Sequence, residues 1–264
     1  MPILDSQGNP FPPRKTEETT PRTIKGRIAA VAALVAAVTL FVGNIDKIWT
    51  TTSGWIYGKK ETPQTVVVQI TSEGLLKAAQ QITAAADNVT GPEKVEAEQD
   101  AKNLNAAASK LANPISLNSA AEKSSAWLLT AMRELGQQEI AGEQHNQRIL
   151  EYIRSASPSM TSEGDELPWT SFFVNWAFTQ SGIKGTNSGS ARSWLNWGIP
   201  LEQPKPGAVA VFEIAGNPMG GLVGLYLGDA GDYVLCVAGN VGNAVRIRAF
   251  PKSRLLGYRW PKDA

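Results

Sequence analysis

The sequence predicts an α+β fold, in which helical segments come first and a small antiparallel sheet follows. Between residues 73 and 197, apolar residues recur at three- and four-residue spacing in several segments. Four apolar, partly alternating runs then follow at residues 208–212, 222–227, 233–237 and 244–247, separated by turn residues, as in a meandering sheet. With 42% hydrophobic residues and 8 Trp among 264 residues, the chain can bury a core.

The composition narrows the classes of function. There are 25 basic and 24 acidic residues, so nothing points to a polyanion, and no nucleic-acid partner is expected. A single Cys and a single His exclude a disulfide framework and a Cys/His metal cluster, so neither a metal nor a cofactor is expected. Cys236 lies in the strand-like run YVLCV and is interpreted as a small buried hydrophobe. His145 is interpreted as a surface or cap residue at the start of a helix.

The N-terminal part of the chain predicts a membrane anchor. Residues 1–27 are rich in Pro, Thr and charge, which is typical of a disordered tail. Residues 28–45 contain no charged side chain, and 18 apolar or neutral residues come close to the ~20 that span a bilayer. Trp49, Trp55 and Tyr57 follow, where an aromatic belt belongs. A buried helix of a soluble domain is the alternative interpretation.

The basic residues that flank residues 28–45 favour one orientation. The N-terminal cluster lies slightly closer to the apolar run, which favours a single pass with the N-terminus inside and the large C-terminal part outside. We therefore expect a single-pass membrane protein whose C-terminal domain lies outside the cytoplasm. The basic residues compared are Arg22, Lys25 and Arg27 before the run, and Lys47, Lys59 and Lys60 after it.

A linker and a helical hairpin are predicted next. Residues 46–72 form the juxtamembrane linker, with a short strand or extended segment at residues 65–70. Residues 73–118 contain two Ala-rich seams, and Gly91 and Pro92 break the pattern between them. A spacer or oligomerising stalk and plain helical packing are equally good interpretations. The seams are Leu75, Ala79, Ile82, Ala86 and Val89, then Ala97, Ala101, Leu104, Ala108 and Leu111.

The stretch LPWTSFFVNW at residues 167–176 predicts a buried amphipathic helix. Pro168 suits the lead-in and Thr170 is a good N-cap residue. An apolar face of Phe and Trp side chains follows at helical spacing, and Gly182 ends the helix.

The same stretch resembles the PWC motif of NlpC-type and CHAP-type cysteine peptidases, the papain-like peptidoglycan hydrolases. The resemblance continues, in order, through MRELGQQEI, HNQRILEYIR, GTNSGSARSWLNWG, KPGAVAVF, GLVGLYLG, AGN and SRLLGYRW. It covers residues 127–262, about half of the chain. It implies that residues 119–264 form a papain-like domain, with N-terminal helices packed on a small antiparallel sheet. With the predicted span, it also implies location at a bacterial inner (cytoplasmic) membrane, with a periplasmic or extracytoplasmic C-terminal domain.

The departures from the family pattern decide the predicted function. Thr170 stands where the family has its nucleophilic Cys at the helix N-terminus. Leu222, in GLVGLY, stands where the family has its catalytic His in GHVGFY. Asn240 remains at the position of the third, orienting polar residue, so the resemblance implies a degenerate member without catalytic residues. A Cys at 170 and a His at 222 would be expected to lie within hydrogen-bond reach.

Three functional hypotheses remain open. The first is a membrane-anchored, degenerate hydrolase that binds a peptidoglycan peptide or a protein partner in the old substrate groove, lined by Trp169, Trp176, Asn240 and Glu166. The second is an active amidase or endopeptidase with non-standard residues, and the third is a membrane-anchored scaffold that binds through its hairpin.

Two further sets of residues bear on these hypotheses. Thr170 would need a base, and acid chemistry would draw on Glu163, Asp165 and Glu166, which otherwise belong to a solvated loop. Near the C-terminus, a basic set could bind a carboxylate-bearing peptide or an anionic polymer, although a solvated sheet face is the simpler interpretation. That set is Arg246, Arg248, Lys252, Arg254 and Arg259.

Overall fold

A computed structural model describes residues 67–87, 90–118, 126–140, 144–157, 164–165, 167–214 and 216–262. The predicted tail at residues 1–27, the predicted span at residues 28–45 and most of the linker at residues 46–72 lie outside the described residues. Within the described ranges, no helix is both long enough and apolar enough to cross a membrane.

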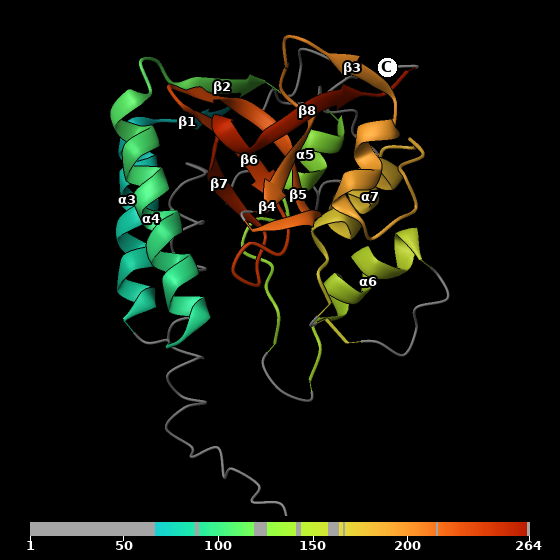
Figure 1. Cartoon of the computed structure of the whole chain (residues 1–264), viewed down its shortest axis with the longest axis horizontal. Helices are drawn as coiled ribbons and strands as arrows, with labels where there is room; N and C mark the ends of the chain where they lie inside the picture. Colours follow the sequence, from blue (N-terminus) through green and yellow to red (C-terminus); the bar gives the residue numbers. More distant parts are fainter. Residues whose placement is uncertain are drawn as a thin grey trace, which may run out of the picture.

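The described residues have an α+β architecture, as the sequence predicts (Figure 1). The elements, in chain order, are β1 (Val67–Ile70), α3 (Ser72–Ala86), α4 (Pro92–Lys110), β2 (Ile115–Asn118), α5 (Ala126–Met132), α6 (Gln147–Ala156), α7 (Thr170–Gln180), the 3₁₀ helix η3 (Ala191–Asn196), β3 (Ile199–Leu201), β4 (Val209–Ile214), β5 (Asn217–Ala230), β6 (Tyr233–Ala238), β7 (Arg246–Pro251), the 3₁₀ helix η4 (Lys252–Arg254) and β8 (Leu255–Trp260).

The main sheet has six antiparallel strands in the order β3-β8-β4-β5-β6-β7. Three of the predicted apolar runs are confirmed as strands β4, β5 and β6. The fourth predicted run, at residues 244–247, is shifted, because the strand begins only at Arg246. Strand β8, the last strand of the chain, lies between β3 and β4. It therefore pairs with β4, the first strand of the meander β4-β5-β6-β7.

Helices cover the sheet from two sides (Figure 1). The hairpin of α3 and α4 lies on one side, where α4 contacts β7. Helix α7 lies on the other side, between β5 and the helices α5 and α6. The hairpin, the sheet and the helices around α7 therefore form three layers. Alternate residues of β5 face α7 on one side and the hairpin on the other.

The helical hairpin is part of the fold's core. Gly91, with φ 71°, makes the turn, and Pro92 opens α4 at a position where its missing N–H costs no hydrogen bond. The buried seam residues Leu75 and Leu104 belong to one hydrophobic cluster with the sheet and α7. Strands β1 and β2 pair at the open end of the hairpin, from Val67 with Asn118 to Ile70 with Ile115. Plain helical packing therefore accounts for the seams that the structure describes, whereas Val89 lies outside the described residues.

Helix α7 confirms the predicted buried helix, and it is buried on all sides over Thr170 to Phe178, not only on its face of Phe and Trp side chains. The reason is that α6 and α5 cover the side of α7 that faces away from the sheet. Gly182, with φ 74°, follows the helix end as predicted. Thr170 is not the N-cap: it is the first residue of the helix, and Trp169 holds the cap position without a side-chain hydrogen bond.

Candidate functional site

Thr170 uses its hydroxyl to join the start of α7 to the sheet. The side chain is buried, and Oγ1 donates a hydrogen bond to the backbone carbonyl of Val223 at 2.9 Å. The backbone N–H of Val223 lies 3.4 Å from the same oxygen. The hydroxyl at the predicted nucleophile position is therefore already engaged by the backbone of β5.

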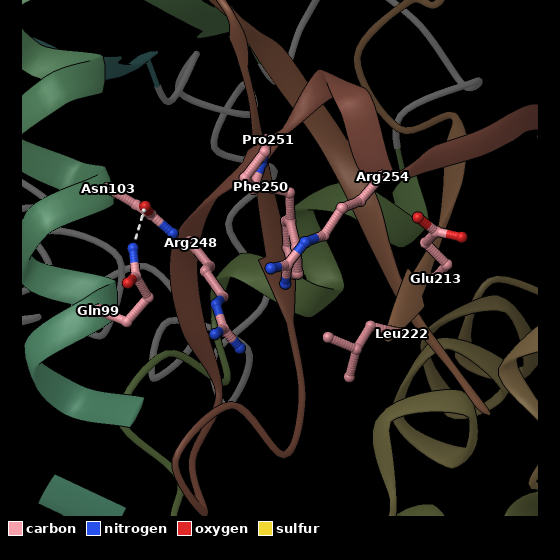
Figure 2. A pocket seen from close by; sticks show the side chains of 8 residues that line it. All are labelled: Gln99, Asn103, Glu213, Leu222, Arg248, Phe250, Pro251 and Arg254. Carbon is pink, nitrogen blue, oxygen red and sulfur yellow. Dashed lines mark hydrogen bonds between the residues drawn. The ribbon is translucent and has the colours of Figure 1, made fainter. Parts of the chain in front are cut away.

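Leu222 lies next to this contact but on the other face of the sheet. Successive side chains of a strand point to opposite faces. A Cβ on Gly221 would meet Ala191 of η3 at 3.4 Å, so Gly221 and Val223 face the side of η3 and α7. Leu222 points the other way and lines a pocket beside α4 (Figure 2). The expectation that positions 170 and 222 face each other within hydrogen-bond reach is therefore wrong.

Asn240 supports the segment that leads into α7. Its backbone is left-handed, with φ 52°, which Asn tolerates better than most residues. Its side-chain Nδ2 donates to the carbonyl of Leu167 at 3.2 Å. The preceding Gly239 lies against Trp169, where an added Cβ would approach the ring to 2.5 Å. The AGN motif thus has a structural role next to the N-terminus of α7.

Trp169 and Trp176 belong to the core, so these two rings do not line an open groove. Trp169 is 0% exposed and Trp176 is 3% exposed. Trp169 Nε1 donates to Glu139 at 2.8 Å, and Trp176 Nε1 donates to Glu151 at 3.1 Å. Both rings contact Tyr152. The fourth predicted groove residue, Glu166, lies outside the described residues.

The acidic loop before α7 is not simply solvated, because Asp165 is 0% exposed. Its carboxylate accepts hydrogen bonds from the backbone N–H groups of Ile140 and Asn146, at 3.2 and 2.8 Å. It also lies 2.9 Å from Nδ1 of His145. His145 therefore has a partly exposed position just before the N-cap of α6, as predicted, and its ring is tied to a buried carboxylate. Glu163 lies outside the described residues.

A pocket between α4 and the sheet holds the second group of candidate residues (Figure 2). Arg248 is fixed at its edge by ion pairs with Asp100, at 2.6 Å, and Glu96, at 3.2 Å. Burial raises the pKa of Asp100 to about 6, and the guanidinium of Arg248 only partly offsets this. The lining residues are Gln99, Asn103, Glu213, Leu222, Arg248, Phe250, Pro251 and Arg254.

The sequence pointed to only part of this pocket. Arg248 and Arg254 belong to the basic set noted near the C-terminus, and they share the pocket although they come from different elements, β7 and η4. Arg246 of the same set is buried, and its guanidinium donates to the carbonyl of Gly242. Gln99 and Asn103 were missed, because polar residues on a helix are usually solvated and only the packing of α4 on β7 brings them to the sheet.

The thiol of Cys236 and the possible metal ligands are the remaining groups to consider. Cys236 is 0% exposed in β6, which confirms the predicted buried strand position, and burial raises its pKa well above the ordinary thiol value. Among the described residues, no three His, Cys, Asp or Glu side chains form a group that could hold a metal ion.

Comparison with known proteins gives a weak structural likeness. No protein-family model matches the chain, and no curated protein matches it. Among solved structures, the chain is similar to a protein from Staphylococcus aureus subsp. aureus Mu50 described as similar to a lipoprotein of the NLP/P60 family. The sequence identity is 13%, the TM-score is 0.32, and the match covers 90% of this chain and 75% of that chain. A TM-score of this size does not establish a shared family.

Proposed function

We propose that this chain is a catalytically inactive, papain-like binding protein that recognises a cell-wall peptide instead of cleaving it. One observation carries the proposal: the hydroxyl of Thr170 is buried and donates to the carbonyl of Val223. A hydroxyl nucleophile needs a neighbouring base to remove its proton. The side chain of Leu222, at the expected base position, is apolar and lies on the opposite face of the sheet.

The other groups that could act as nucleophile or base are engaged elsewhere. His145 is the single His of the chain, and its Nδ1 lies against the buried carboxylate of Asp165. The thiol of Cys236 is enclosed in the sheet, and its raised pKa opposes thiolate formation. A nucleophile–base pair is therefore not assembled from these residues.

The nature of the ligand is proposed from the sequence motifs. The resemblance to peptidoglycan hydrolases over residues 127–262 supports a wall peptide as the ligand. We propose further that residues 28–45 anchor the chain in the cytoplasmic membrane and place the folded part on the side of the wall. A protein partner is the alternative ligand within the same proposal.

The test for catalysis uses purified full-length protein in detergent. Wild type and Thr170→Ala are incubated with muropeptides, beside an active NlpC-type endopeptidase as the positive control, and products are followed by mass spectrometry. We expect no new products from either form of the chain. Turnover by wild type that Thr170→Ala abolishes would make Thr170 a working nucleophile and overturn the proposal.

The test for binding uses sedimentation with insoluble peptidoglycan. We expect the full-length protein to sediment with the wall material, and excess soluble muropeptide to release it. A protein that stays in the supernatant at all protein-to-wall ratios would favour the scaffold hypothesis, in which the fold serves a protein partner.

A further inference from the structure

We propose that the pocket between α4 and the sheet, lined by Asn103, Arg248, Arg254, Leu222 and Phe250, binds the carboxylate of a small aliphatic amino acid or peptide end. This inference names the ligand chemistry and the place of binding. It rests on the proposed function only for the source of the ligand, a wall peptide.

The first observation is an amide donor without an acceptor in the described part of the chain. Asn103 is 7% exposed, and its Oδ1 accepts a hydrogen bond from Nε2 of Gln99 at 2.9 Å. This bond orients the amide, so that Nδ2 lies on the pocket side (Figure 2). Among the residues that the structure describes, none accepts a hydrogen bond from this Nδ2. The Nδ2 donor is therefore available to a ligand at the wall of the pocket.

The second observation is a guanidinium without an ion pair to any described residue. Asp100 and Glu96 already neutralise and fix Arg248, whose side chain is 13% exposed. Arg254, by contrast, makes no ion pair within the described part of the chain, and its guanidinium extends into the pocket (Figure 2). A planar guanidinium matches a carboxylate and can bind it through two parallel hydrogen bonds. The pocket therefore offers one free cation and one free amide donor to an anionic ligand.

The third observation concerns the apolar part of the pocket. Phe250 stacks on Phe212 with a centroid distance of 4.3 Å, and Leu222 lies opposite Phe212 in the sheet. Phe250 and Leu222 give the pocket an apolar floor beside its donors, and Phe212 lies against both of them. A short aliphatic side chain can be buried there while the carboxylate reaches Arg254, as in most small-molecule sites, where few polar groups orient a mostly apolar ligand.

Glu213 distinguishes two forms of the ligand. It lines the pocket, is exposed, and makes no ion pair with a described residue. Figure 2 shows it on the side of the pocket away from Asn103. A free ammonium group would be attracted to this carboxylate, so a zwitterion should bind better than the same compound with its amine acetylated.

The binding experiment uses calorimetry on the full-length protein in detergent, with three probes. These are alanine, which carries both charges, N-acetylalanine, which carries only the carboxylate, and N-acetylalanine methyl ester, which carries neither. We expect binding in the order alanine, then N-acetylalanine, with no heat from the ester. A muropeptide with a free carboxylate is added as a fourth probe, to separate a wall source from a general amino-acid source.

Two variants and one matched control locate the site. Arg254→Gln and Asn103→Asp should each weaken N-acetylalanine binding at least about ten-fold, because one removes the cation and the other places an anion beside the ligand. Lys252→Gln removes one positive charge from the same short helix, η4, but Lys252 pairs with Asp229 and does not line the pocket. Its binding should equal wild type.

The possible outcomes separate this inference from the proposed function. Absence of binding by wild type, or an equal loss in Lys252→Gln and Arg254→Gln, would overturn the pocket assignment. If wild type hydrolyses muropeptides but N-acetylalanine binding still depends on Arg254, the proposed inactivity fails and the pocket stands. Circular dichroism of each variant checks that the fold is retained.

Discussion

The hydroxyl of Thr170 donates a 2.9 Å hydrogen bond to the carbonyl of Val223, which fixes the first turn of α7 to strand β5 at the residue after Leu222. Thr170→Val keeps the shape of the side chain and removes this bond. We expect the free energy of unfolding to fall by roughly 1 kcal/mol, the usual net value of a hydrogen bond. Urea unfolding followed by Trp fluorescence measures it. Thr170→Ser, which keeps the hydroxyl, should lose less stability than Thr170→Ala.

The double substitution Thr170→Cys with Leu222→His should not create a reactive dyad. The side chain of residue 222 lies on the α4 face of the sheet, whereas residue 170 lies on the α7 face. The imidazole would therefore not reach the thiol to lower its pKa. We expect iodoacetamide at pH 7 to modify the native double variant no faster than Thr170→Cys alone. A large acceleration by the His would show that the two positions do meet.

The stability of the chain should depend on pH through Asp100. Its pKa is about 6 in the folded protein and 3.8 as the ordinary value, so the folded state binds the proton more tightly. Below pH 4, the higher pKa of Asp100 in the folded state therefore adds roughly 3 kcal/mol to the free energy of unfolding. This stabilisation is lost as the pH rises through 6. Asp100→Asn removes the carboxyl group that titrates and, with it, this dependence on pH.

Urea unfolding of wild type and Asp100→Asn at pH 4, 5, 6 and 7 isolates the effect, because the other carboxyl groups are common to both proteins. The difference in unfolding free energy between them should shift in favour of the variant as the pH rises. A difference that is constant over this range would show that Asp100 keeps an ordinary pKa in the fold.

Gly239→Ala should destabilise the core beneath Trp169. The added Cβ would lie 2.5 Å from the Trp169 ring and 2.7 Å from Cβ of Phe173, and neither neighbour can move freely in a filled core. We expect a loss of about 1–3 kcal/mol, as for other overpacked sites. Asn240→Gly is the companion variant: it keeps the left-handed backbone and loses only the hydrogen bond to Leu167, so its loss should be smaller.

The proposed membrane anchor predicts how the chain fractionates. Full-length protein should remain with membranes through an alkaline carbonate wash, because residues 28–45 would be held in the bilayer core. Replacing Ala36 and Val42 by Lys should release the protein, since charge at the bilayer centre is costly. Wild-type protein in the wash supernatant would contradict the anchor.

The strands of the sheet centre could be predicted because their residues face layers on both sides and are apolar over several positions. Strand β3 could not, because it has only three residues and contains Pro200. Strand β8 alternates weakly, and Gly257 and Arg259 interrupt its apolar pattern. The hairpin was predicted from its seams, but not its packing on β7, which depends on the long-range pair of Asp100 and Arg248.

The candidate site was predicted less well than the fold, for a physical reason. A motif places Thr170 and Leu222 at given positions in the sequence, but the pleat of β5 decides which face each side chain occupies. The pocket was harder still, because its polar residues come from α4 and from the C-terminal strands, which only tertiary packing brings together.

The pairing of β1 with β2 has a mechanical consequence. Val67 and Asn118 form one end of a four-pair antiparallel ladder, and the chain leaves the ladder at this same end in both directions. Tension between the N-terminal segment and residues beyond β2 would load one pair at a time, which resists far less force than shearing all pairs together. A chain held at its N-terminus and by a ligand at its folded part would open this ladder first and lengthen, while the six-stranded sheet stays intact.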